Sequence, residues 1–121
     1  MLKSPDPLVQ SQGALGLSQL GEKAAPAVPA LSEALKSPDA LVRQNAALAL
    51  TNIGPDSRPA IPALTAALRD PEWPVRRQAA LALGALGPAA SDATLALQQL
   101  TRDSNSLVRR AALESLAKIR K

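Results

Sequence analysis

The stretch DALVRQNAALALTNIGP, residues 39–55, decides the fold, because it returns in closely similar form as EWPVRRQAALALGALGP at residues 72–88. The two stretches are offset by 33 residues, the step of an array of paired helices. Laid against itself at this offset, the whole chain stays in register without an insertion. Three apolar columns run through four copies: Val9, Val42, Val75, Val108; Leu17, Leu50, Leu83, Leu116; and Leu20, Ile53, Leu86, Ile119. We therefore expect one domain, residues 1–121, with copies at approximately 2–34, 35–67, 68–100 and a partial copy at 101–121.

Each copy predicts two helices. The three columns are spaced by eight and three residues, which places them on one helical face. In the second copy this first helix is expected from about Asp39 to Ile53, with Gly54 as a left-handed C-terminal cap. A second apolar stripe predicts a shorter second helix, at Val28, Leu31 and Leu35 and again at Ile61, Leu64 and Leu68. Because one pair cannot bury its apolar face alone, the pairs must stack into an all-α superhelix of about seven helices.

Composition excludes most catalytic chemistry. The chain is 46% hydrophobic but holds one aromatic residue, Trp73, and neither cysteine nor histidine. The usual ligands of zinc, iron–sulfur clusters and haem are therefore missing, as are Cys- and His-based catalytic arrangements. We expect no enzyme activity and no cofactor. No signal peptide and no apolar run of membrane-spanning length is evident, so a cytoplasmic location is the expectation.

With the repeats established, the pattern resembles HEAT repeats, which are armadillo-like helical arrays, and among them the short phycobilisome-lyase HEAT-like type. The resemblance rests on the two quoted stretches, on the proline inside the second helix, and on the acidic residue that precedes the Val-Arg pair. It implies a scaffold that binds a helix or an extended segment of another protein. The family name also implies an alternative, a subunit related to bilin lyases or isomerases, although the chain has no His, Cys or Tyr to handle a tetrapyrrole.

By resemblance, the default binding face is the concave surface formed by the second helices. Its residues are small and mostly uncharged, and the positions expected there are Ala30, Glu33, Ala63, Ala66, Ala96 and Gln99. A groove of this kind accepts a partner segment closely, but it offers no charge to select one.

The arginines of the Val-Arg pairs have two interpretations. The resemblance implies a structural ladder, in which Arg43, Arg76 and Arg109 bond inter-repeat aspartates; Asp70 and Asp103 stand at matching positions, whereas Ser4 and Ser37 depart from the pattern. Alternatively the arginines form a basic stripe for phosphate or acidic partners. Arg77 and Arg110 have no assigned partner and are the better contact candidates, although solvated arginines are the simpler interpretation. They support a third function, nucleic-acid or anionic-surface binding by residues 61–121, which carry nine basic and five acidic groups.

A further column, Leu15, Leu48 and Leu81, continues as Glu114 in the last copy. Its helical angle predicts that these leucines face outward as an apolar strip for a partner helix, or for a second copy of the chain in a homodimer. Alternatively, neighbouring first helices cover them in part. Trp73 begins the third copy's first helix, either as a local packing plug, which we prefer, or as an exposed anchor for a partner.

Overall fold

The computed structural model describes residues 26–120, and within them every regular element is helical. Six α-helices are separated by turns and by two 3₁₀ segments. The helices are α2 (Val28–Ala34), α3 (Ala40–Ile53), α4 (Ile61–Ala67), α5 (Trp73–Ala85), α6 (Thr94–Leu100) and α7 (Ser106–Ile119), and the 3₁₀ segments are η2 (Gly54–Ala60) and η3 (Gly87–Ala93). The first helix expected in the first copy, together with Leu15, falls outside these residues. In the part of the chain described, no helix has the length and apolar character needed to cross a bilayer.

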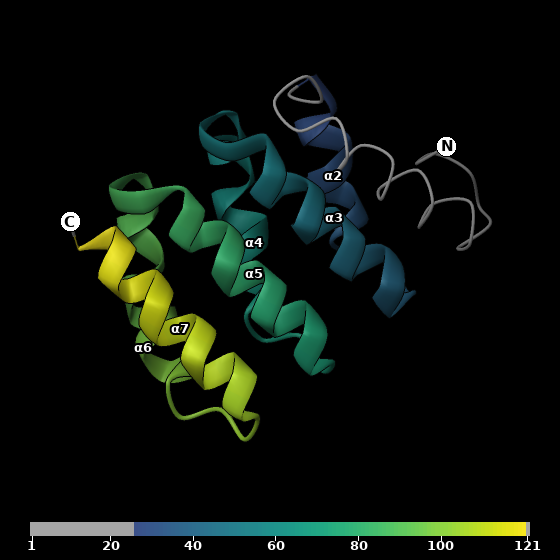
Figure 1. Ribbon diagram of the computed structural model, residues 1–121. Helices are drawn as coiled ribbons and strands as arrows, with labels where there is room; N and C mark the ends of the chain where they lie inside the picture. The colour runs from purple at the N-terminus through teal and green to yellow at the C-terminus, as the bar shows by residue number, and fades with distance from the viewer. Residues whose placement is uncertain (1–25, 121) are drawn as a thin grey trace.

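The helices form two layers, as Figure 1 shows. The long helices α3, α5 and α7 lie side by side, and the short helices α2, α4 and α6 lie behind them. Each short helix packs against the long helix that follows it in the chain. The predicted all-α array of stacked helix pairs is therefore confirmed over the described residues.

The boundaries of α3 follow from local chemistry. Asp39 is its N-cap, and the Asp39 carboxylate accepts hydrogen bonds from the backbone N–H groups of Leu41 at 2.9 Å and Val42 at 3.1 Å. The helix ends at Gly54, which has the positive φ expected of a glycine cap, +80°. Its ψ of −137° lies outside the left-handed helical region that the sequence predicted. The chain continues from Gly54 into the 3₁₀ segment η2, which contains Pro59, before α4 begins.

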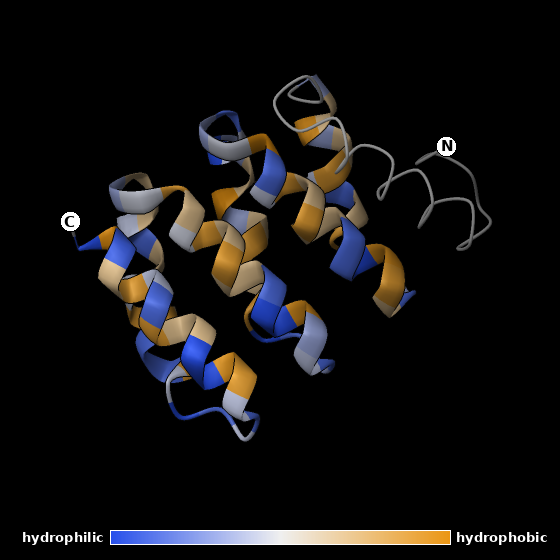
Figure 2. Ribbon diagram, in the orientation of Figure 1, coloured by the Kyte–Doolittle hydropathy of each residue, from blue (hydrophilic) through white to orange (hydrophobic). Residues whose placement is uncertain are grey.

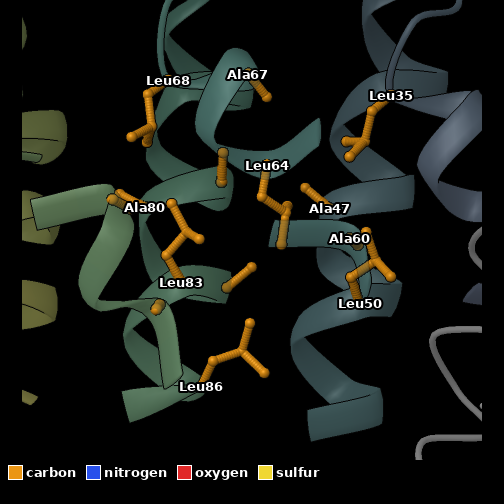
Figure 3. Packing of buried hydrophobic residues seen from close by; sticks show 14 of the residues in the cluster. Leu35, Ala47, Leu50, Ala60, Leu64, Ala67, Leu68, Ala80, Leu83 and Leu86 are labelled. Atoms are coloured by element: carbon orange, nitrogen blue, oxygen red, sulfur yellow. The ribbon is translucent and has the colours of Figure 1, made fainter. Parts of the chain in front are cut away.

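The core lies between the two layers and is built from the predicted apolar columns. Figure 3 shows Leu50 of α3, Leu64 of α4 and Leu83 of α5 converging there. Each is at most 1% exposed. Burying one leucine of this kind stabilises the fold by about 1.5–3 kcal/mol, so the repeated columns hold adjacent pairs together. The resulting stack presents its outer surfaces at fixed positions.

Candidate functional site

Two arginines of the predicted ladder join successive repeats. Arg43 Nε donates to Asp70 Oδ1 at 2.6 Å, and Arg43 Nη2 donates to Asp70 Oδ2 at 3.2 Å. One repeat later, Arg76 forms the same paired bonds with Asp103, at 2.8 and 3.1 Å. All four side chains are largely buried. These arginines therefore hold the stack together and are not free to form a basic stripe.

The ladder aspartates also organise the turn before the next helix. Asp103 Oδ2 accepts a hydrogen bond from the backbone N–H of Asn105, the residue that caps α7. Burial by itself raises the pKa of the Asp103 carboxyl. The bonds from Arg76 and Asn105, with the positive charges of Arg76 and Arg109, outweigh burial and lower this pKa from its ordinary value. Asp103 is therefore held as a carboxylate.

Arg109 differs from the other two ladder arginines. Its Nη1 donates to the carbonyl oxygen of Asp103 at 2.7 Å, as Arg43 and Arg76 do to Ser37 and Asp70. Within residues 26–120, however, no carboxylate meets its Nε or Nη2. Of the three arginines predicted to form the ladder, Arg43 and Arg76 therefore pair with an aspartate of the next repeat, and Arg109 does not do so within the described residues.

A groove lies between α5 and α7 and combines two kinds of predicted contact residue. We call it the α5–α7 groove; it has a volume of about 210 Å³ and is lined by Arg77, Leu81, Leu107, Arg110, Ala111 and Glu114. Four of these were singled out in the sequence: Arg77 and Arg110 as contacts, Leu81 and Glu114 as one column. Among the described residues, neither arginine takes part in an ion pair.

Sequence reasoning missed Leu107 and Ala111. Leu107 is 43% exposed at the start of α7, and its column holds Leu8, Leu41 and Pro74 in the preceding copies. Leucine occupies this column in three of the four copies, so the repeat carried a periodic signal that sequence reasoning did not use. A search for large apolar residues off the buried face of α7 would have found Leu107.

The prediction that the leucines of the Leu48 and Leu81 column face outward is wrong for both residues. Leu48 and Leu81 are half-buried, not exposed, and Leu81 packs against the core cluster. The physical reason is that α3, α5 and α7 pack side by side, so each long helix partly covers its neighbour. The alternative of partial cover by neighbouring first helices therefore describes both residues, and no continuous exposed strip forms between them.

The surface formed by α2, α4 and α6 is partly closed. Ala30, Ala63 and Ala96 are half-buried, whereas Glu33, Ala66 and Gln99 are exposed. Glu33 lies 4.0 Å from Lys36 Nζ in an exposed pair, which contributes little. Gln99 borders a hollow of about 450 Å³ with Gln98, Thr101 and Arg102. The four side chains that line this hollow are all polar or charged.

Trp73 is exposed at 40% of its surface and begins α5. Trp73 is therefore packed only in part, and both interpretations, packing and an anchor for a partner, stay predictions. Other large apolar side chains exposed on the described surface are Leu41, Leu95, Leu107 and Leu113. Figure 2 shows hydrophobic residues interrupted by hydrophilic ones along the long helices.

Comparison with known proteins identifies the fold independently. A sequence profile of HEAT repeats matches residues 1–81 and 61–121. No curated protein matches the chain significantly. Two engineered proteins of known crystal structure are 28% and 26% identical, with TM-scores of 0.82 and 0.86 over 98% of this chain. A designed armadillo repeat protein, 18% identical, has a TM-score of 0.79 over 98% of this chain and so shares the fold.

The chain spans about three fifths of the length of these structures, covering 59%, 60% and 61% of them. The comparisons match helical repeats in general. The narrower phycobilisome-lyase resemblance stays a prediction, and so does the alternative of a bilin-related subunit.

Proposed function

Because the chain belongs to the HEAT-repeat family, we propose that it is a non-catalytic scaffold that binds another protein, with the α5–α7 groove as its binding site. One observation carries this proposal. The groove sets the exposed Leu107 and the half-buried Leu81 beside two arginines that have no ion-pair partner in residues 26–120. Apolar side chains and arginines lie together in many protein-interaction sites.

The shape of the groove favours a helix as the bound segment. It lies between two parallel ridges, α5 and α7, and a third helix can place one apolar stripe between them. Arg77 and Arg110 then face the flanks of that stripe. We expect a partner helix with apolar residues at helical spacing and with Asp or Glu beside them.

The same residues argue against nucleic acid as the main partner. The groove offers two arginines with Glu114 beside them, whereas phosphate backbones require a denser basic surface. The single tryptophan of the chain, Trp73, is not among the residues that line the groove, so base stacking there has no aromatic platform. A protein helix with apolar and acidic residues can contact both Leu107 and the two arginines.

The test uses the full chain with matched variants. Leu107→Glu places a carboxylate in the groove, and Leu41→Glu makes the same change two copies earlier, at a leucine that is also exposed. A third variant, Leu95→Glu, changes the layer of short helices. Captured proteins are identified by mass spectrometry, and the purified partner is titrated against each variant by calorimetry.

Loss of binding by at least about tenfold in Leu107→Glu, with Leu41→Glu unchanged, is the expected result. The new carboxylate removes the apolar contact of Leu107 and competes with the partner's own carboxylates for Arg77 and Arg110. Binding lost only in Leu95→Glu would move the site to the short-helix layer and reject the groove. Capture of nucleic acid alone, with a steep loss of binding between low and physiological salt, would reject the protein-scaffold proposal.

A further inference from the structure

The side chains of the α5–α7 groove follow one another in a fixed order along its length. Its two walls, α5 and α7, lie side by side and run in the same direction, as Figure 1 shows. Arg77 and Arg110 occupy the same position of successive repeats, so they lie at one level of the groove. Leu81 and Glu114 follow them by four residues and share the next level, which is about 6 Å further along the helix axes.

The charge of the groove changes sign between these two levels. The first level carries two positive charges, and the second carries the carboxylate of Glu114 opposite Leu81. Lys118 lies one turn further along α7 and is not among the residues that line the groove. Leucine stands in the column of Glu114 in every preceding copy, so the carboxylate departs from the repeat. The groove therefore has a positive part and a negative part in a fixed order.

The charged side chains of the groove are not paired with one another. Glu114 lies one turn from Arg110 and one turn from Lys118, a spacing at which ion pairs form within a helix. Among residues 26–120, however, no ion pair joins Glu114 to either cation or to Arg77. Glu114 is also exposed. Its carboxylate is therefore accessible to a basic residue of a bound segment.

We propose that Glu114 makes the α5–α7 groove selective for a helix that carries an acidic and a basic residue one turn apart, on one flank of its apolar stripe. This inference rests on the proposed function, the binding of a protein helix in this groove. The acidic residue contacts Arg77 and Arg110, and the basic residue contacts Glu114. Because these contacts have a fixed order, a helix with the acidic residue first runs parallel to α5 and α7, and a helix with the basic residue first runs antiparallel.

A helix with two acidic residues fits the groove less well. Its second carboxylate would lie at the level of Glu114, where like charges repel. The net charge of the chain acts in the opposite sense, because a charge of +4 attracts the more acidic helix. A comparison of the two kinds of helix therefore separates the effect of Glu114 from the effect of net charge.

The test titrates the isotope-labelled full chain with three alanine-based helical peptides of about 18 residues, each with one stripe of leucines. The acid–base peptide carries glutamate and, one turn later, lysine on one flank of the stripe. The acid–acid peptide carries glutamate at both positions. The reversed peptide has the sequence of the acid–base peptide in the opposite order. Binding is followed by NMR at the backbone amides of α5 and α7.

We expect shifts at the residues of the α5–α7 groove, and at least about threefold tighter binding of the acid–base peptide than of the acid–acid peptide at low ionic strength. Glu114→Gln should remove most of this preference, and Glu114→Arg should reverse it. Glu33→Gln is the matched control, because it removes the same charge from an exposed glutamate of α2 and should leave the preference unchanged.

The direction of binding gives a second readout. A helix with the reversed sequence presents the same side chains at the same places when it runs in the opposite direction, because both helices are right-handed. A nitroxide label at the N-terminus of the acid–base peptide should therefore broaden amide signals near Leu107. The same label on the reversed peptide should broaden signals near Lys118.

Two kinds of failure are distinguishable. Shifts at the groove with equal or tighter binding of the acid–acid peptide, with a preference that survives Glu114→Gln, or with one direction for both labelled peptides would overturn the selectivity. The groove would then remain a binding site for a helix. If none of the peptides shifts the groove amides, the groove is rejected as a helix-binding site, and the selectivity is rejected with it.

Discussion

Ser115 of α7 fills the space beside Gly84 of α5 and donates a hydrogen bond to the carbonyl oxygen of Ala80 at 2.6 Å. A Cβ on Gly84 would stand 2.5 Å from Ser115 Oγ and 2.9 Å from the α-carbon of Ser115. In the preceding interface the equivalent positions are Thr51 and Ala82, so the larger residue is on the other helix. At each of these two interfaces between long helices, a small residue on one helix therefore faces a larger residue on the other.

Gly84→Ala is therefore expected to lower the free energy of unfolding by about 1–3 kcal/mol, because α5 and α7 must move apart to accommodate the methyl group. The gain in helix propensity of up to about 1 kcal/mol offsets only part of this loss. Urea denaturation followed by circular dichroism measures the change. Ser115→Gly in the same chain should restore part of the stability but not all, since the backbone of α7 still lies too close to the added methyl group. An unchanged denaturation midpoint in Gly84→Ala would contradict the packing.

Adjacent arginines on α5 should respond differently to the same substitution. Arg76→Gln removes the paired bonds to Asp103 and leaves that carboxylate buried, so we expect a loss of about 2 kcal/mol in the free energy of unfolding. Arg77→Gln changes a side chain without an ion pair in the described residues, and its effect should stay within about 0.5 kcal/mol. Both are measured by urea denaturation at neutral pH. Equal losses would mean that the ladder does not stabilise the stack.

The ladder also predicts a dependence of stability on pH. The pKa of Asp103 is lowered in the folded state, so the unfolded chain binds a proton at higher pH than the folded chain does. The stabilisation is complete above the pKa of the carboxyl in the unfolded chain, about 3.9. It is lost as the pH falls through the lowered pKa of Asp103 in the folded chain. Asp103→Asn should reduce the melting temperature at about pH 7 and narrow its difference from the wild type below about pH 4. A difference that stays constant from neutral to strongly acidic pH would contradict this linkage.

The fold could be predicted from the sequence because the same apolar pattern recurs in each copy, so each copy supports the assignment of the others. The valine column at Val42, Val75 and Val108 is at most 1% exposed in every described copy. The site was harder to predict because it depends on the distance between neighbouring helices, which a helical angle does not contain. Leu81 has the angle of an outward residue and is nonetheless half-buried, since α7 lies beside it. The helical angle shows which way Leu81 faces on its own helix, but it does not show that a neighbouring helix covers that side.

Ala80 and Leu113 occupy the same position of successive repeats, and we expect a leucine to be tolerated at residue 113 but not at residue 80. Ala80 is completely buried where α7 covers α5, so Ala80→Leu must force these helices apart and should cost about 1–3 kcal/mol in the free energy of unfolding. Leu113→Ala makes the reverse change in α7, where the side chain is 61% exposed, and should alter the free energy of unfolding by no more than about 0.5 kcal/mol. Urea denaturation of both variants measures the contrast. A large loss in Leu113→Ala would show that Leu113 packs against the protein itself, contrary to its exposed position.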